Sequence, residues 1–314
     1  MKARAEARRF AAVDLGTNTI LLLVADIETD GSFVVLEDAA RITRLGEGVD
    51  RNGALSEAAQ ERSLQALRHY AEECRRLAVD EVAVVGTSAL RDAVNRDAFI
   101  DRVARDLGWK LRVLSAEEEA RYSFIAVCAG LDLRGQEVLA VDVGGGSTEL
   151  IWGRDGVPSA WVTTQLGSVR LTERYLVADP PRAEECREVI AAVDRELELR
   201  CAALRDAHRP QSAVGIAGTF TTLSALAQGL RTYSHSDVHG AVLTLAEVER
   251  LIELFQGRSA AERRAIPGLE PGRADVILAG SLLVERVMRF FRFDRILISD
   301  QGVRYGILYE RLGR

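Results

Sequence analysis

Two short segments of this sequence carry aspartate, glycine and hydroxyl residues in the same order, and each follows an apolar run. The first is Asp14–Thr19 and the second is Asp142–Glu149. In both segments we expect a strand, a tight glycine-containing turn and a second strand. Backbone N–H groups of such a turn can approach an anion closely, and Ser or Thr hydroxyls add hydrogen-bond donors. The chemistry that these residues favour is phosphate binding.

The aspartate that ends each first strand suits a metal ligand better than a direct phosphate contact. A carboxylate beside phosphate needs a cation such as Mg²⁺ between them. The alternative for either turn alone is an ordinary hairpin with glycine at positive φ. Neither segment is a Walker A loop or a dinucleotide fingerprint, because the sequence patterns of both are absent.

A second informative stretch runs from Ser115 to Glu119. Ser115 and Glu118 have the spacing of a capping box, so Glu118 has a structural role at a helix start. Glu119 is not needed for that role, and the small Ser123 and Ala126 on its helix face would leave room for a cleft. The helix N-terminus should keep Glu119 ionised and make it a weak base. The alternative is a solvated carboxylate.

Arg91 ends the segment Thr87-Ser88-Ala89-Leu90-Arg91, which follows a buried strand. Ligands of open α/β sheets bind in the crevice at the carboxyl ends of the strands, so Arg91 is a candidate ligand-binding residue. A surface arginine is the alternative. Lysine occurs only at Lys2 and Lys110, so nearly all the positive charge is on arginine. Some of these guanidinium groups can bind two phosphate oxygens at once; the alternative is that the arginine content reflects composition alone.

Strands alternate with helices in both halves of the chain, which predicts an α/β fold. The pattern restarts at the second segment, and the two aspartates are 128 positions apart (142 minus 14). We therefore expect a duplicated domain with bounds at residues 1–128 and 129–301. The C-terminal helix, 302–314, is free to pack back onto the first domain. In the second half we expect helices at 182–207, 245–257 and 273–291, and a Gly/Thr turn at Ala217-Gly218-Thr219.

Composition narrows the class of protein. The net charge of −6 disfavours a surface made for nucleic acid. No run is long and apolar enough to span a membrane, and no targeting segment is evident. The four cysteines show no C-x-x-C pattern, which fits a reducing cytoplasm.

Several motifs together resemble those of the exopolyphosphatase and guanosine pentaphosphate phosphohydrolase family, and the resemblance is to its short, two-domain members. The motifs occur in the family's order over nearly the whole chain: Val13–Thr19, Thr87–Arg91, Glu118–Arg121, Asp142–Glu149, Ala217–Thr219 and Ser299–Gly306. Threonine stands at Thr17 and Thr19 where family members often have serine, which keeps the hydroxyl.

The resemblance implies two duplicated actin-like (ribonuclease H-like) domains with a cleft between them. It also implies Mg²⁺-dependent release of a terminal phosphate from inorganic polyphosphate or from guanosine pentaphosphate, and it allows a homodimer. The family's catalytic residues correspond to Glu119 and Arg91, and its metal-binding carboxylates to Asp142 and Glu149. The candidate phosphate-binding residues are Asp14, Gly16, Thr17, Asn18, Thr19, Gly144, Gly145, Gly146, Ser147, Gly218 and Thr219.

The leading hypothesis is an exopolyphosphatase in which Glu119 orients and deprotonates the attacking water. Guanosine pentaphosphate hydrolysis is the alternative within the same class. An actin-like ATP-binding kinase or chaperone and a silent polyphosphate-binding module are the alternatives from other classes. We also expect arginines to attract the polyanion, with Arg91 and Arg121 as the first candidates and Arg170 and Arg304 as further ones.

Overall fold

The computed structural model describes residues 8–131 and 133–313 of the chain. The chain divides into two compact units, which we call unit 1 and unit 2 and describe separately. Unit 1 comprises Met1–Tyr122 and Val303–Arg314, and unit 2 comprises Ser123–Gly302.

The division between the units falls within helix α5 (Ala116–Gly130). The sequence-based boundary between residues 128 and 129 stays a prediction about where an independently folding domain ends. Unit 1 is discontinuous in sequence, because the C-terminal helix α13 (Val303–Arg311) belongs to it. This helix packs on the first two strands of unit 1.

Unit 1 is built on a five-stranded sheet with the strand order β3-β2-β1-β4-β5. The pairs β1–β2 and β2–β3 are antiparallel, and the pairs β1–β4 and β4–β5 are parallel. The strands are β1 (Arg8–Leu15), β2 (Thr19–Ile27), β3 (Phe33–Ile42), β4 (Glu81–Gly86) and β5 (Leu111–Val113).

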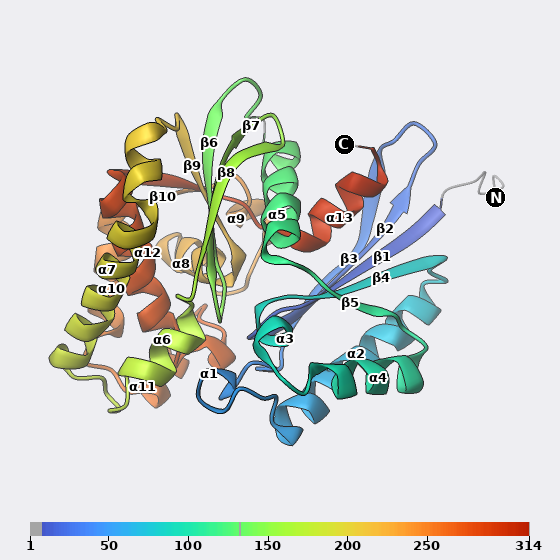
Figure 1. Cartoon of the computed structure of the whole chain (residues 1–314), viewed down its shortest axis with the longest axis horizontal. Coiled ribbons are helices and arrows are strands. Elements are labelled where there is room, and N and C mark those ends of the chain that lie inside the picture. The colour runs from blue at the N-terminus through green and yellow to red at the C-terminus, as the bar shows by residue number, and fades with distance from the viewer. Residues whose placement is uncertain (1–7, 132, 314) are drawn as a thin grey trace. The chain divides into compact units, whose positions relative to one another are not determined.

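Helices cover both faces of this sheet (Figure 1). Helices α2 and α4 pack against each other on one face, and α13 lies on the other. The Ser56 side chain accepts a hydrogen bond from the Ala59 N–H at 3.2 Å and caps the start of α2. The helices are α1 (Val49–Asn52), α2 (Glu57–Arg76), α3 (Ser88–Asp92) and α4 (Arg96–Leu107).

Unit 2 is built on a six-stranded sheet with the order β10-β11-β9-β6-β7-β8. Its strands are β6 (Glu137–Val143), β7 (Thr148–Arg154), β8 (Val157–Thr164), β9 (Ser212–Ile216), β10 (Val242–Thr244) and β11 (Arg295–Ile298). Its helices are α6 (Ser168–Tyr175), α7 (Ala183–Ala207), α8 (Ala217–Ala227), α9 (His235–Val238), α10 (Leu245–Phe255), α11 (Ala260–Arg264) and α12 (Ile277–Phe291), with a 3₁₀ turn at Pro271–Arg273.

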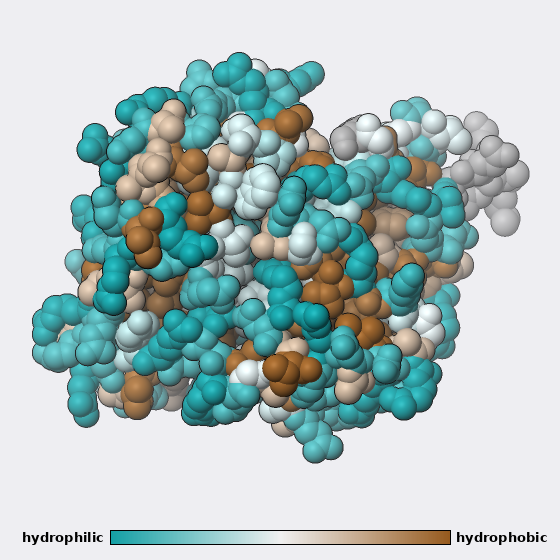
Figure 2. Space-filling view, viewed as in Figure 1, coloured by the Kyte–Doolittle hydropathy of each residue, from teal (hydrophilic) through white to brown (hydrophobic). Residues whose placement is uncertain are grey.

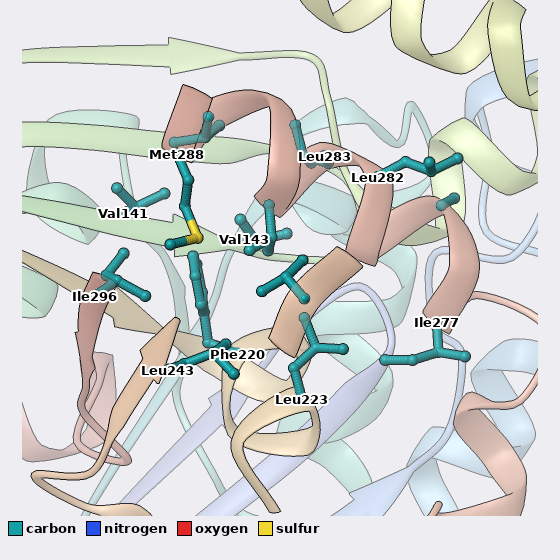
Figure 3. Packing of buried hydrophobic residues seen from close by; sticks show 14 of the residues in the cluster. Val141, Val143, Phe220, Leu223, Leu243, Ile277, Leu282, Leu283, Met288 and Ile296 are labelled. Carbon is teal, nitrogen blue, oxygen red and sulfur yellow. The ribbon is translucent and has the colours of Figure 1, made fainter. Parts of the chain in front are cut away.

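The core of unit 2 lies between this sheet and helices α7, α8, α10 and α12. Figure 3 shows strand residues Val141 and Val143 together with Phe220 of α8 and Met288 of α12. All four are almost fully buried. Burial of such side chains from water is the main force that holds the helices on the sheet.

Two expectations about unit 2 were wrong. Ala217-Gly218-Thr219 is the first turn of helix α8 and not a turn between elements. Helix α12 begins at Ile277 and not at Arg273, because Pro271–Arg273 forms a 3₁₀ turn that ends before it. Arg273 therefore lies on a connecting segment, which changes what its side chain can reach.

The two sheets repeat one topology. In unit 1 the order β3-β2-β1-β4-β5 has the same connections and directions as β8-β7-β6-β9-β11 in unit 2, and β10 is an additional edge strand. The expected α/β class with duplicated actin-like (ribonuclease H-like) units is thereby confirmed.

The surface shown in Figure 2 is largely hydrophilic, with apolar residues in small separate groups. Such scattered exposure is normal for a folded domain in water. Among residues 8–131 and 133–313, no helix has both the length and the apolar character needed to cross a membrane.

Candidate active site

The turns after β1 and β6 have the same backbone structure. We call Gly16–Thr19 loop 1 and Gly144–Ser147 loop 2. In loop 1 the first N–H donates to the last carbonyl oxygen at 3.0 Å, and in loop 2 the equivalent bond is also 3.0 Å. A Cβ atom on Gly16 would lie 3.0 Å from the Thr19 carbonyl oxygen, and one on Gly144 would lie 3.1 Å from that of Ser147. Glycine at the first position therefore permits this tight turn.

The carbonyl oxygens of loop 2 are hydrogen-bonded by the start of helix α6. Its first residues donate backbone N–H bonds, and one arginine side chain adds a further bond. The bonds are Ser168 N to Gly144 O (3.0 Å), Val169 N to Gly145 O (2.9 Å), Arg170 N to Gly145 O (3.1 Å) and Arg170 Nε to Gly146 O (2.7 Å). Three successive peptide carbonyls are thus directed toward α6.

The direction of these carbonyls determines where the N–H groups of loop 2 point. In a trans peptide the C=O and the following N–H point in opposite directions. The N–H groups of Gly145, Gly146 and Ser147 are therefore directed away from α6. No protein acceptor for them is found among the residues that the structure describes. Successive N–H groups with this arrangement form an anion-binding nest.

Loop 1 is held in the same manner by a different segment. The N–H groups of Thr43 and Arg44 both donate to the Asn18 carbonyl oxygen at 3.0 Å, and that of Gly46 donates to the Thr17 oxygen at 2.9 Å. The buried Oδ1 atom of Asn18 has no hydrogen-bond partner within the described part of the chain. Loop 1 thus offers an acceptor oxygen as well as amide donors.

Two carboxylates flank loop 2 at its base. Asp142 and Glu149 are directly opposite in the β6–β7 ladder, and both are buried. The Ser123 hydroxyl donates to Asp142 Oδ2 at 2.9 Å. In loop 1 the residue opposite Asp14 is Leu21. Opposed carboxylates in a sheet repel each other, and a cation between them would remove the repulsion.

These two carboxylates fit a hard cation such as Mg²⁺. Magnesium takes oxygen ligands, keeps several waters, and is commonly bound by one or two carboxylates together with substrate phosphates. The described residues contain no cluster of three or more His, Cys, Asp or Glu side chains arranged for a metal. Any Mg²⁺ at Asp142 and Glu149 would therefore depend on water and phosphate for its other ligands.

Two neighbouring glutamates at the start of helix α5, Glu118 and Glu119, have different surroundings. The predicted capping box is confirmed: Glu118 Oε2 accepts from the Ser115 N–H at 2.8 Å, and the Ser115 hydroxyl accepts from the Glu118 N–H at 3.1 Å. Glu119 is only 8% exposed, so the alternative of a solvated carboxylate is wrong. Ser123 and Ala126 are also buried, so they do not open a cleft along the helix.

The environment of Glu119 reverses the expectation of a weak base. Burial raises the pKa of Glu119, and the charge and hydrogen bond of Arg91 oppose that rise without cancelling it. The Arg91 Nη1 donates to Glu119 Oε2 at 2.5 Å and to the Leu114 carbonyl oxygen at 3.2 Å. Desolvation outweighs the helix N-terminus here, because the carboxylate is almost out of contact with water.

Arg273 is a charged residue in unit 2 that the sequence did not single out. A Cβ atom on Gly218 would lie 2.1 Å from Arg273 Nη1, so the guanidinium packs directly on the first turn of α8. Burial lowers the pKa of Arg273, and no ion pair or hydrogen bond of its guanidinium is found among the described residues. Ala217 beside it has a strained φ of 70°. Only the turn-forming Pro271-Gly272 pair marked this segment in the sequence.

Comparison with known proteins identifies the family. The sequence profile of the Ppx/GppA phosphatase family matches residues 23–314. This chain belongs to the Ppx/GppA phosphatase family.

Full-length relatives agree with this membership. The Ppx/GppA chain is 37% identical over 319 residues to a Mycobacterium tuberculosis protein named exopolyphosphatase 2, with 97% of this chain and 99% of the relative covered. A crystal structure of the Aquifex aeolicus member of the family matches with a TM-score of 0.81 and 33% identity, covering 98% and 99% of the two chains. An exopolyphosphatase from Cytophaga hutchinsonii matches with a TM-score of 0.89 and 29% identity, covering 98% of each chain.

The structure groups the predicted site residues of this Ppx/GppA protein within their own units. In unit 1, the Thr87 N–H donates to the Leu15 carbonyl oxygen at 3.2 Å, which ties the start of α3 to the end of β1. In unit 2, a Cβ atom on Gly280 would lie 2.8 Å from Thr219 Cγ2 and 3.3 Å from Ser168 Cβ. The starts of α6 and α8 therefore converge beside α12.

Two of the arginines expected to attract a polyanion have carboxylate partners within unit 1. Arg121 forms an ion pair with Glu310 at 2.5 Å. Arg304 donates from Nη2 to both oxygens of Asp38, at 2.9 Å and 3.1 Å, and is buried. Such pairs satisfy the guanidinium groups inside the protein, so these two residues are poor candidates for phosphate contacts.

Proposed function

We propose that this protein is an exopolyphosphatase, which removes the terminal phosphate of inorganic polyphosphate by hydrolysis. The observation that carries the proposal is loop 2, where three N–H groups form a nest and Asp142 and Glu149 flank its base. N–H groups of this kind bind phosphate oxygens, and paired carboxylates suit a cation bound to phosphate. The exopolyphosphatase relatives support the same substrate class.

Glu119 is the proposed catalytic base. The oxygen of a water molecule attacks the terminal phosphorus in line with the bridging oxygen, and Glu119 orients this water and accepts its proton. The P–O bond to the rest of the chain breaks, and the shortened polyphosphate leaves with the bonding electrons. The raised pKa of Glu119 makes it a stronger base than an exposed carboxylate, and Arg91 orients it.

The remaining candidate residues bind phosphate oxygens in this proposal. Loop 1, loop 2, Gly218 and Thr219 supply the uncharged contacts, and Arg273 adds a positive charge. Arg273 suits this role because its desolvated charge lies on Gly218 and needs an anionic partner. Asp14, at the strand end before loop 1, carries a carboxylate and would not contact a phosphate oxygen directly. Mg²⁺ held by Asp142 and Glu149 would neutralise charge on the phosphate oxygens.

The deciding experiment measures phosphate release from long polyphosphate, with guanosine pentaphosphate and ATP assayed alongside under the same conditions. We expect release from polyphosphate, and release about 10²-fold slower or more by the Glu119→Gln variant. Faster release from guanosine pentaphosphate would move the assignment to that alternative. Sugar-dependent ADP formation from ATP would instead indicate a kinase.

The cytoplasm as the compartment of the reaction is also a proposal. The four cysteines are free, which fits a reducing cytoplasm. A homodimer is part of the proposal as well, and light scattering of the purified protein tests it directly.

A further inference from the structure

Arg170 lies behind loop 2, on the side opposite to its N–H nest. It belongs to the first turn of α6 and is only 8% exposed. Its Nε donates to the Gly146 carbonyl oxygen at 2.7 Å, and its backbone N–H donates to the Gly145 oxygen at 3.1 Å. From the sequence this arginine is a candidate cation for the substrate, but these two bonds tie it to the loop itself.

The bond from Nε acts on the peptide that joins Gly146 to Ser147. Because a peptide is planar, holding the Gly146 oxygen also fixes the direction of the Ser147 N–H. Glycine accepts backbone angles that other residues avoid, so a peptide that follows two glycines can rotate easily unless it is held. The backbone N–H groups of α6 hold the two preceding peptides, and Arg170 holds this one.

We propose that Arg170 is a positioning residue, which locks the Gly146–Ser147 peptide so that the Ser147 N–H is aimed at a phosphate oxygen. The proposal rests on the function proposed above for loop 2. It assigns the arginine to the orientation of the nest, not to the substrate. Donors that are aimed before the reaction stabilise charge as it develops in the transition state.

Loop 1 explains why a side chain is critical only in loop 2. The residue equivalent to Gly146 is Asn18, 128 positions earlier (146 minus 128). Its carbonyl oxygen accepts from the backbone N–H groups of Thr43 and Arg44, both at 3.0 Å. Backbone donors remain when a side chain is changed. Substitution of Arg170 therefore removes the hydrogen bond to the Gly146 carbonyl oxygen, whereas no single side-chain substitution removes the equivalent backbone bonds in loop 1.

The test compares Arg170→Lys and Arg170→Met with the control Arg286→Met. Arg286 is an α12 arginine whose Nε donates to Asp194 Oδ1 at 2.7 Å and makes no bond to loop 2. We measure kcat and KM on polyphosphate at several salt concentrations, and urea unfolding of each variant. Arg170→Met should lower kcat/KM by about 10- to 100-fold, the range for a lost hydrogen bond from a charged donor. The loss should lie mainly in kcat, and Arg170→Lys should recover part of it.

Salt dependence separates a positioning role from direct substrate binding. Removal of a cation that contacts the polyanion should flatten the dependence of KM on ionic strength, whereas removal of a positioning residue should leave it unchanged. A flatter dependence in Arg170→Met, or kcat/KM equal to that of Arg286→Met, overturns the proposal. If Arg170→Met fails to fold, Arg170→Lys is the deciding variant, because Lys keeps the charge without the Nε donor. A kcat below that of the wild type supports the positioning role, and a kcat equal to it overturns the proposal.

Binding of inorganic triphosphate tests the same role without turnover. Calorimetry on the Glu119→Gln protein, with and without Arg170→Met, should show weaker binding in the double variant, by a smaller factor than the loss in kcat, because the Ser147 N–H contributes less to ground-state binding than to the transition state. If the wild-type protein does not hydrolyse polyphosphate, the proposed function fails, while this measurement still decides the role of Arg170. Equal binding by both proteins would count against the positioning role.

Discussion

Loop 1 and loop 2 have the same turn but different surroundings. Each begins with a glycine that the tight bend requires, and each has its carbonyl oxygens held from behind. The residue opposite the strand-end aspartate differs: it is Leu21 in unit 1 and Glu149 in unit 2. The shape that binds anions is thus duplicated, whereas the carboxylate pair is present in unit 2 alone.

This difference gives a physical reason for two roles that the family resemblance already distinguishes. From the residues alone, both strand-end aspartates suit a metal ligand, whereas the resemblance implies a metal at Asp142 and Glu149 and leaves Asp14 among the phosphate-binding candidates. The structure leaves Asp14 opposite an apolar side chain and gives Asp142 a second carboxylate and a serine hydroxyl. We therefore expect the cation to depend on unit 2, and loop 1 to contribute to phosphate binding only.

The largest effect on activity should come from removing the catalytic base, which neither loop supplies. Glu119→Gln should lower kcat by about 10²-fold or more, because a positioned base contributes at least that much. Binding of polyphosphate should change little, since both loops remain intact. Single-turnover kinetics together with calorimetry measure the two quantities separately.

Glu118→Gln is the matched control, since glutamine also serves in a capping box. If this variant loses turnover while Glu119→Gln keeps it, the assignment within the pair is wrong. The pH profile gives a second check. Because burial raises the pKa of Glu119 above its ordinary 4.5, activity should be lost as the pH falls through a midpoint above 4.5. Arg91→Met should move this midpoint higher, because Arg91 lowers the pKa.

The next effect tests the metal asymmetry between the two loops. Asp142→Asn should raise the Mg²⁺ concentration needed for half-maximal activity by about 10-fold or more, because a neutral amide is a poorer ligand for a hard cation. Glu149→Gln should act in the same direction, more weakly. Asp14→Asn should leave the Mg²⁺ titration unchanged. Equal shifts in all three variants would mean that the loops share the cation.

A smaller effect distinguishes how the two loops are held. A Cβ atom on Gly167 would lie 2.3 Å from the Gly145 carbonyl oxygen, whereas one on Gly46 would lie 2.3 Å from the Thr17 side-chain methyl. Both alanine variants should lose about 1–3 kcal/mol of unfolding free energy, as overpacked sites do. Thr17→Ser removes the methyl group that Gly46→Ala meets.

The Thr17→Ser change should therefore restore part of the stability of Gly46→Ala and none of that of Gly167→Ala. Urea unfolding of the single and double variants measures this. Rescue of both glycine variants, or of neither, would show that the contacts behind the two loops do not differ in this way.

The smallest effect should come from Arg121→Gln. Arg121 is about two-fifths exposed and pairs with Glu310, and such surface ion pairs contribute about 0–1 kcal/mol. We expect kcat/KM within about 2-fold of the wild type and a small shift in unfolding midpoint. A large loss of activity would return Arg121 to the substrate-binding residues.

The parts of the fold that local sequence governs were predictable. The duplication, the two glycine turns and the cap at Ser115 follow from the preferences of a few adjacent residues. The α8 start was mistaken for a turn, because Gly218 and Thr219 favour turns locally while tertiary packing builds a helix.

The parts of the candidate site that depend on distant contacts were not predictable. The raised pKa of Glu119 results from burial, which spacing along the chain does not reveal. Arg273 reaches Gly218 across 55 positions (273 minus 218), and no local pattern connects them. The sequence indicates Arg170 as a candidate cation for the substrate, but its bond to the Gly146 carbonyl oxygen depends on how α6 packs on loop 2.

The return of α13 to unit 1 has a consequence for synthesis on the ribosome. Unit 2 is one continuous stretch of chain, whereas one face of the unit 1 sheet lacks its covering helix until Val303–Arg311 is made. Asp38, near the start of the chain, receives Arg304 and the Tyr305 hydroxyl from that helix. The domain that is translated first is therefore completed last, and chains truncated before residue 303 leave an apolar sheet face without its covering helix and the Asp38 carboxylate without Arg304 and Tyr305.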